Sequence, residues 1–204
     1  MAQRLDGVRV AILATDMVEE SELVEPRQAL ETAGAETELI APQAGKIMAA
    51  KHFDKAGSYE VDTVLAEADP ADYDALFLPG GALNADQLRV LPEAQQFVRA
   101  FDADGRPIAA ICHAPWLLVS AGLVGGRTLT SYHTLADDIR NAGGIWLDNA
   151  VVEDANWVSS RQPSDIPEFN EAMLDLYETS CVETELVTDT EFAFGERINE
   201  DEEE

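Results

Sequence analysis

The chain has 204 residues, of which 46% are hydrophobic and 26% are charged, a length and composition typical of a soluble globular protein with one core. A formal net charge of −27 repels phosphate backbones and anionic lipid, which excludes nucleic acid and membrane surfaces as partners. No apolar run reaches the ~18 residues that cross a bilayer, and the 2 cysteines lie outside the usual zinc and dithiol spacings. We therefore expect a cytoplasmic protein without a metal or cofactor.

The first half of the chain alternates predicted strands and helices. We predict strands at 8–14, 36–41 and 75–78, a helix from a Ser21 cap to Gly34, a hairpin or excursion at 46–62, and a polar helical stretch ending at Gly105. Pro79, Gly80 and Gly81 end the 75–78 strand.

The second half continues the alternation. We predict strands at 107–111, 127–130, 145–146 and 151–152, and helices at 114–121, 135–142 and 166–177. Strands that alternate with helices form right-handed βαβ units, so the fold class expected is α/β with a mainly parallel sheet covered on both faces. We assign residues 1–178 to a single domain and residues 179–204 to an acidic C-terminal extension.

The acidity extends beyond this extension. From Glu178 onward there are 11 acids and one base, which leaves 29 acids and 12 bases on the first 177 residues. Such a surface repels itself unless salt screens it, so the sequence suggests a halophilic protein. A merely acidic protein with a solvating tail is the alternative.

Three unusual segments follow predicted strands, and the carboxyl ends of neighbouring parallel strands form one edge, where ligands bind. The segments are the acids Asp16, Glu19 and Glu20, the pair Gly80 and Gly81, and the pair Cys112 and His113. We expect these groups to converge on one site.

Cys112 occupies the junction where a buried strand turns directly into a helix, the arrangement called a nucleophile elbow. Small residues are needed two positions to either side, and Ala110 and Ala114 meet that need. The start of the following helix favours a thiolate, so we expect a lowered thiol pKa.

These residues resemble a known family. The segment Ala109–Trp116, with Leu78–Gly81 upstream and Val158–Asp165 downstream, is similar to the PfpI family of the class I glutamine amidotransferase-like superfamily. The resemblance covers roughly residues 7–178. It implies a flavodoxin-like three-layer sandwich and an obligate homodimer, often assembled into hexamers, with the site at the subunit interface.

The resemblance also implies roles for individual residues. Cys112 matches the nucleophile and His113 its neighbouring base. Glu19 matches the glutamate that hydrogen-bonds the cysteine sulfur, whereas on composition alone Glu20 and Glu22 compete with it. Asp86 matches an acid that orients the histidine of an adjacent subunit.

The remaining implied roles concern the pocket. The backbone N–H groups of Gly81 and His113 are expected to form an oxyanion hole, and Gly80 and Tyr132 to belong to the substrate pocket. Ala114 departs from the family's usual glycine, and its methyl group is expected to narrow the pocket or to shift the start of the helix.

Three functions fit this constellation. The first is a stress-protective hydrolase of the glyoxalase III or deglycase type, in which Cys112 adds to a reactive carbonyl compound or glycation adduct while Glu19 and His113 relay protons. The second is an intracellular cysteine peptidase acting on peptides. The third is a non-catalytic redox sensor or chaperone with an oxidisable cysteine.

Overall fold

Short apolar segments form the central sheet of the protein, whose computed structural model describes residues 4–183. The sheet has seven strands in the spatial order β11 (Val151–Asp154), β12 (Trp157–Ser160), β8 (Ile108–Ile111), β7 (Ala75–Leu78), β1 (Arg9–Leu13), β3 (Glu36–Ala41) and β6 (Thr63–Val64). All pairs are parallel except β11 with β12. The predicted α/β fold with a mainly parallel sheet is confirmed.

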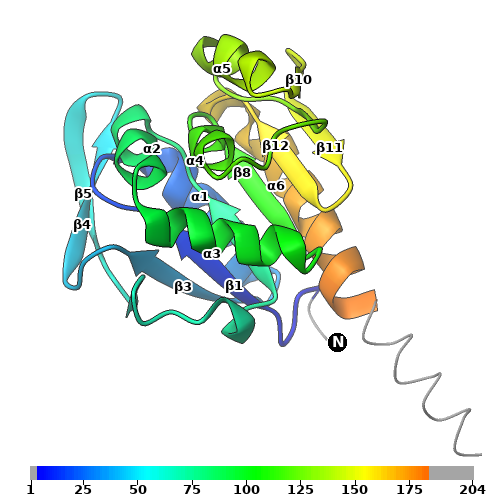
Figure 1. Cartoon of the computed structure of the whole chain (residues 1–204). Coiled ribbons are helices and arrows are strands. Elements are labelled where there is room, and N and C mark those ends of the chain that lie inside the picture. Colours follow the sequence, from blue (N-terminus) through cyan, green and yellow to red (C-terminus); the bar gives the residue numbers. More distant parts are fainter. Residues whose placement is uncertain (1–3, 184–204) are drawn as a thin grey trace, which may run out of the picture.

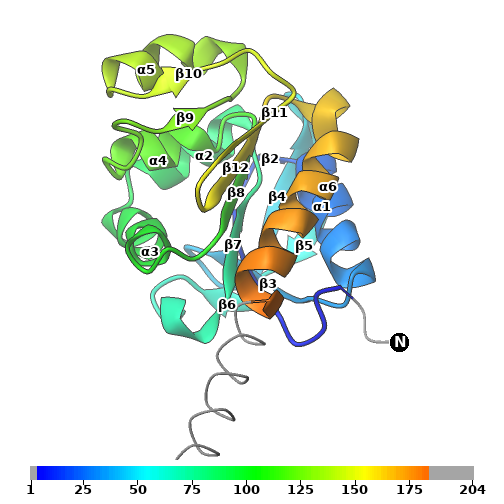
Figure 2. The same ribbon diagram turned by 90° about the vertical axis from the view of Figure 1, so that its right-hand side faces the viewer.

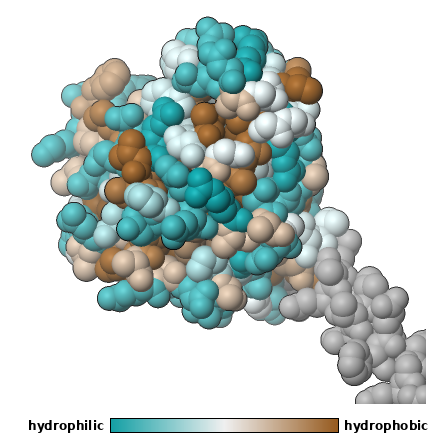
Figure 3. Space-filling view, viewed as in Figure 1, coloured by the Kyte–Doolittle hydropathy of each residue, from teal (hydrophilic) through white to brown (hydrophobic). Residues whose placement is uncertain are grey.

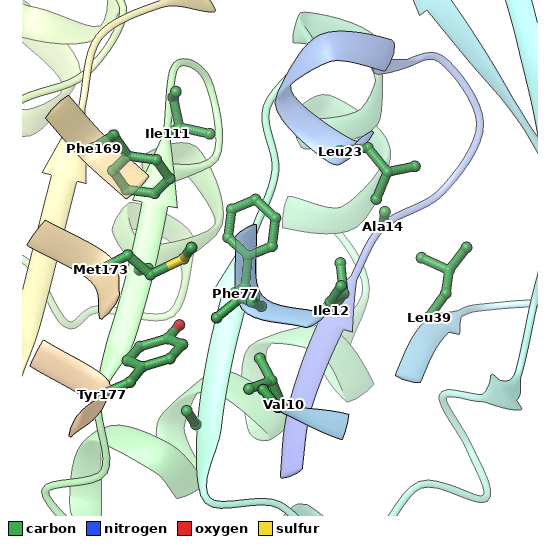
Figure 4. Close-up of a cluster of buried hydrophobic side chains, with 14 of the residues drawn as sticks. Val10, Ile12, Ala14, Leu23, Leu39, Phe77, Ile111, Phe169, Met173 and Tyr177 are labelled. Atoms are coloured by element: carbon green, nitrogen blue, oxygen red, sulfur yellow. The ribbon is translucent and has the colours of Figure 1, made fainter. Parts of the chain in front are cut away.

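Helices cover both faces of this sheet (Figures 1 and 2). One face packs against α1 (Glu20–Thr32) and α6 (Ile166–Tyr177), and the other against α2 (Ala82–Arg89), α3 (Pro92–Ala103) and α4 (Pro115–Ser120). Since successive strand residues point to opposite faces, each strand supplies both cores. Figure 4 shows Phe77 of β7 facing Phe169 and Met173 of α6 in the first core.

The remaining elements lie around the sheet. The hairpin is formed by β4 (Lys46–Lys51) and β5 (Asp54–Glu60), and β4 pairs with the short β2 (Val18–Glu19). The other short elements are the 3-10 turns Pro70–Asp72, His133–Leu135 and Pro163–Asp165, helix α5 (Ala136–Asn141), and the paired strands β9 (Thr128–Leu129) and β10 (Ile145–Trp146). The hairpin predicted at 46–62 is confirmed.

Three predicted details are wrong. Ser21 does not cap α1, because the helix already begins at Glu20. The stretch ending at Gly105 is two helices, because Pro92 has no backbone N–H to continue α2 and instead begins α3. β12 was not predicted as a strand, although it pairs in parallel with β8 along its whole length.

The C-terminal end of the described chain continues α6 as a π-helical turn at Glu178–Glu183. The rest of the predicted acidic extension, residues 184–204, lies outside the described residues. Within residues 4–183, no helix has both the length and the apolar character needed to span a membrane.

The few basic side chains are grouped or paired with acids. All three lysines, Lys46, Lys51 and Lys55, belong to the β4–β5 hairpin. Arg4 contacts three carboxylates near the end of α6, and Arg161 contacts Asp148 and Asp165, each at 2.8 Å. Hydrophilic residues are widespread on the face seen in Figure 3. Since acids outnumber bases 40 to 13, the basic residues cannot neutralise the carboxylates one for one.

We predict that salt stabilises the protein. Raising KCl from about 0.1 M to about 2 M shortens the screening length from roughly 10 Å to below 3 Å, which weakens repulsion among the carboxylates. Equilibrium urea unfolding and refolding yield at each salt concentration measure the effect. Equal stability at low and multimolar KCl would contradict the proposal of a halophilic protein.

Candidate active site

The backbone of Cys112 is held in a left-handed conformation between β8 and α4, with φ 62°. A non-glycine residue rarely adopts this conformation, which costs about 1–3 kcal/mol and requires support from its surroundings. That support comes from both sides: the Cys112 N–H donates to the Ser160 carbonyl at 3.0 Å, and the Tyr132 N–H donates to the Cys112 carbonyl at 2.8 Å. The predicted strand-to-helix elbow is confirmed.

The sulfur of Cys112 contacts polar groups from three segments. The buried carboxyl group of Glu22, in the first turn of α1, lies close to it. The backbone N–H groups of Gly81 and His113 also donate toward the sulfur. His113 Nδ1 lies 3.1 Å from Sγ. A potential nucleophile, an acid, an imidazole and two N–H donors therefore meet at one atom.

Glu22 is buried completely, with 0% of its surface exposed. Burial, together with the nearby charge of Glu19, raises the pKa of the Glu22 carboxyl to about 8, although the neighbouring Cys112 thiol and Gly80 backbone oppose the shift. The carboxyl group is therefore mostly protonated at pH 7. In this form it donates a hydrogen bond rather than accepting one.

The pKa of the Cys112 thiol is raised by burial and by the charge of Glu22, while the N–H groups of Gly81 and His113 lower it. The expectation of a lowered thiol pKa is therefore wrong for this chain, because only 6% of Cys112 is exposed to solvent. The two groups form one coupled pair, in which the ionisation of either opposes that of the other. When Glu22 holds its proton, its charge no longer opposes ionisation of the sulfur.

His113 is an uncharged imidazole at neutral pH. Burial and the neighbouring His133 lower the pKa of His113 to about 4. Its ring stacks on Tyr132, with the ring centroids 4.7 Å apart, and meets the edge of Trp116 at 5.6 Å. These contacts fix the ring plane so that Nδ1 faces the sulfur.

The sulfur faces a cavity of about 540 Å³. Its lining comes from α1 and its preceding residue, the hairpin tip, the turns after β7 and β8, the loop with Tyr132, and the turn at Pro163: Glu19, Glu22, His52, Phe53, Gly81, Ala82, Cys112, His113, Tyr132, Thr134, Gln162, Pro163 and Ser164. The predicted convergence of three strand ends is present.

Glu19 lines this cavity, but the prediction that it hydrogen-bonds the sulfur is wrong. Its carboxylate accepts instead from the His52 N–H, at 2.9 Å. Glu19 is the residue before α1, whereas Glu22 belongs to the buried face of the helix together with Pro26 and Leu30, at a spacing of four residues. An acid on this apolar stripe was the signal that identifies Glu22.

Asp16 and Glu20, the other acids predicted to converge on the site, bind the hairpin instead. Asp16 Oδ1 accepts from the Met48 N–H at 2.7 Å. Glu20 Oε1 accepts from the Gly57 N–H at 2.7 Å and from the Tyr59 hydroxyl at 2.9 Å. Of the acids in this segment, Glu22 alone contacts the sulfur.

Two other sequence expectations require correction. Gly80 is not part of the cavity lining; it lies beneath the lining, against Glu22 and Cys112. Ala114 is buried in the core on the α4 side and has helical φ −53°, so its methyl group neither narrows the cavity nor strains the helix start.

The predicted role of Asp86 stays a prediction. Asp86 is exposed on α2 and does not line the cavity. Among residues 4–183, no cluster of three or more His, Cys, Asp or Glu side chains is arranged to hold a metal ion.

Comparison with known proteins gives consistent matches. The profile of the DJ-1/PfpI family matches residues 8–176. The chain is 41% identical to Deglycase TK1284 of Thermococcus kodakarensis over 159 residues, which are 78% of this chain and 93% of that protein. It is 40% identical to Protein/nucleic acid deglycase 2 of Escherichia coli over 169 residues, 82% of this chain and 96% of that protein.

A solved structure shares the fold. A two-domain protein of Anabaena variabilis, which contains DJ-1/ThiJ/PfpI-like and ferritin-like domains, superimposes with a TM-score of 0.78 at 32% identity. The match covers 82% of this chain and 47% of that one.

We predict that Gly80→Ala disrupts the site. A Cβ at Gly80 would lie 2.2 Å from Glu22 Oε2, 2.6 Å from Cys112 Cβ and 2.8 Å from the Ile111 carbonyl. Because backbone atoms cannot give way, the free energy of unfolding falls by about 1–3 kcal/mol. Urea unfolding measures this loss, with Gly125→Ala as a control, since its nearest contact would be 3.7 Å away. Equal stability of the two variants would contradict the packing described.

We predict that Glu22→Gln changes how Cys112 titrates. In the wild type, Glu22 and Cys112 lose two protons in coupled steps, so the rate of alkylation by iodoacetamide shows two inflections, the first near pH 8 and the second at higher pH. The amide of Gln cannot ionise, so only one inflection remains. The rate is followed by mass spectrometry of the peptide containing Cys112.

Glu25→Gln is the matched control for this titration, because Glu25 is an exposed acid on the same helix. It should retain both inflections. Identical profiles for the wild type and Glu22→Gln would remove Glu22 from the site.

Proposed function

The chain belongs to the DJ-1/PfpI family, and we propose that it is a cysteine-dependent hydrolase of the deglycase type, acting on small reactive carbonyl compounds or early glycation adducts. The observation that carries this proposal is the position of the Cys112 sulfur. It faces a cavity of about 540 Å³ while contacting a buried carboxyl group that is protonated at neutral pH.

The first step is addition of sulfur to a carbonyl carbon. With methylglyoxal as substrate, the Cys112 thiolate attacks the aldehyde carbon, a C–S bond forms, and the carbonyl π bond breaks toward oxygen. Glu22 gives its proton to that oxygen, which yields a hemithioacetal and an ionised carboxylate. The N–H groups of Gly81 and His113 provide donors for the developing negative charge.

The second step moves two protons within the bound substrate. The ionised Glu22 removes the proton from the former aldehyde carbon, which gives an enediol, and returns it to the neighbouring ketone carbon, while the hydroxyl proton of the first carbon passes to the oxygen of the second. The first carbon is thereby oxidised to a thioester and the second is reduced to an alcohol. Because the two carbons exchange oxidation level, no external oxidant is needed.

The last step is hydrolysis of the thioester. The neutral imidazole of His113 takes a proton from an attacking water molecule, the C–S bond breaks, and His113 passes its proton to Glu22, which restores the starting state. The sum is methylglyoxal plus water giving lactate and a proton. We further propose that the protein works as a homodimer, often assembled into hexamers, in which Asp86 of a neighbouring subunit orients His113.

A cysteine peptidase is the second candidate, and the 3.1 Å contact between Cys112 and His113 favours it. Amide cleavage requires a protonated imidazole to expel a poor leaving group. The pKa of His113, lowered to about 4, makes that form scarce at pH 7, so carbonyl chemistry fits better.

We predict that the wild type converts methylglyoxal to lactate and that Cys112→Ser lowers the rate by at least about a hundredfold, because a serine hydroxyl is far less ionised than a thiol. Lactate is quantified by chromatography, and casein fragments are assayed in parallel. Cys181→Ser, which changes the other cysteine, is the control and should keep full activity.

Casein fragments without lactate would overturn the deglycase assignment in favour of the peptidase. Absence of both products, with ready oxidation of Cys112 to the sulfinate, would favour the redox sensor.

A further inference from the structure

The carboxylate of Glu19 fixes the tip of the β4–β5 hairpin. Its Oε2 accepts the His52 N–H at 2.9 Å, and His52 has a left-handed backbone with φ 58° at the point where the chain turns. The neighbouring anchors, Asp16 and Glu20, bind Met48 in β4 and Gly57 in β5. The Glu19 contact is thus the anchor farthest along the hairpin, at the end that approaches the active site.

The same contact lies between two cavities. Beside the cavity that contains the Cys112 sulfur there is a second cavity of about 380 Å³. Most of its lining comes from α1 and the β4–β5 hairpin. Glu19, His52 and Pro163 line both cavities. The hydrogen bond between Glu19 and the His52 backbone therefore forms part of the wall that separates them.

The hairpin tip supplies the outer side of that wall. His52 and Phe53 both line the catalytic cavity, yet 84% of the Phe53 surface is exposed, so core packing does not hold the tip. A segment with few buried contacts depends on its hydrogen bonds for its position. Removing the acceptor at Glu19 would therefore release the tip and connect the two cavities.

We infer that Glu19 is a positioning residue whose hydrogen bond to the His52 N–H keeps the two cavities apart and so limits the size of the compound that reaches Cys112. The inference deepens the proposed function and rests on it, because the proposed function supplies small carbonyl compounds as the substrates. It gives Glu19 no part in proton transfer. The hydrogen bond needs only an acceptor oxygen, which the amide of glutamine also supplies.

The experiment compares two maleimides that have the same electrophile and different size. Second-order rate constants for modification of Cys112 by N-methylmaleimide and N-(1-pyrenyl)maleimide are measured on the full chain, by mass spectrometry of the Cys112 peptide. In Glu19→Ala and Glu19→Ser, the rate for the pyrenyl reagent relative to the methyl reagent should rise about fivefold or more, since the wall has opened.

Glu19→Gln should keep the ratio within about twofold of the wild type, because the acceptor is retained. Glu25→Ala is the matched control, since it removes a carboxylate from the second cavity without touching the wall between them, and it should also leave the ratio unchanged. Hydrogen exchange of the 51–55 segment checks the tether itself. Exchange should accelerate in the Ala and Ser variants and remain slow in the Gln variant.

Three results would overturn the inference: a Gln variant that behaves like the Ala variant, a ratio that stays constant while exchange accelerates, or exchange that is unchanged in Ala and Ser. Thermal unfolding establishes that each variant is folded. Alkylation does not require turnover, so the two proposals can fail separately. If only the proposed function is wrong, the wild type produces no lactate from methylglyoxal, but substitutions at Glu19 still change the ratio of the two maleimide rates.

Discussion

The contact between the buried Glu22 carboxyl and the Cys112 sulfur is the constraint on which the site depends. Two anions cannot share a space from which water is excluded, so the ionisation of Glu22 and that of Cys112 oppose each other, and the pKa of each group is raised. Burial thus keeps a proton on Glu22 at neutral pH. That proton is the one that carbonyl addition consumes.

Glu22 and Cys112 stay close to each other because each belongs to a rigid element, on different sides of the sheet edge. Glu22 is fixed by the buried face of α1, and Cys112 by a left-handed backbone that Ser160 and Tyr132 hold through hydrogen bonds. Gly80 lies against both and leaves no space for a side chain. One close approach, that of Glu22 to Cys112, thus accounts for three features: the strained backbone of Cys112, the burial of Glu22 and the absence of a Cβ at Gly80.

The sequence was sufficient for the parallel sheet, most helices, the elbow at Cys112 and the convergence of three strand ends, because apolar runs and glycine breaks are local signals. It was not sufficient for β12, whose Val158, Ser159 and Ser160 have too little apolar character to indicate a buried strand. β12 belongs to the sheet because it pairs with β8, and a contact between residues far apart in the chain leaves no local sequence pattern.

The wrong prediction of Glu19, instead of Glu22, as the glutamate beside the sulfur has a more specific cause. Composition placed several glutamates after the first strand, and the family resemblance selected the wrong one, but helical periodicity distinguishes them once the start of α1 is known. Glu22 shares its face with Pro26 and Leu30 and must turn toward the core, whereas Glu19 precedes the helix and turns toward the hairpin. A protein with so many carboxylates can use neighbouring glutamates for opposite purposes, because burial decides which of them keeps its proton. The less buried Glu19 and Glu20 accept backbone N–H groups of the hairpin, and the buried Glu22 remains for the sulfur.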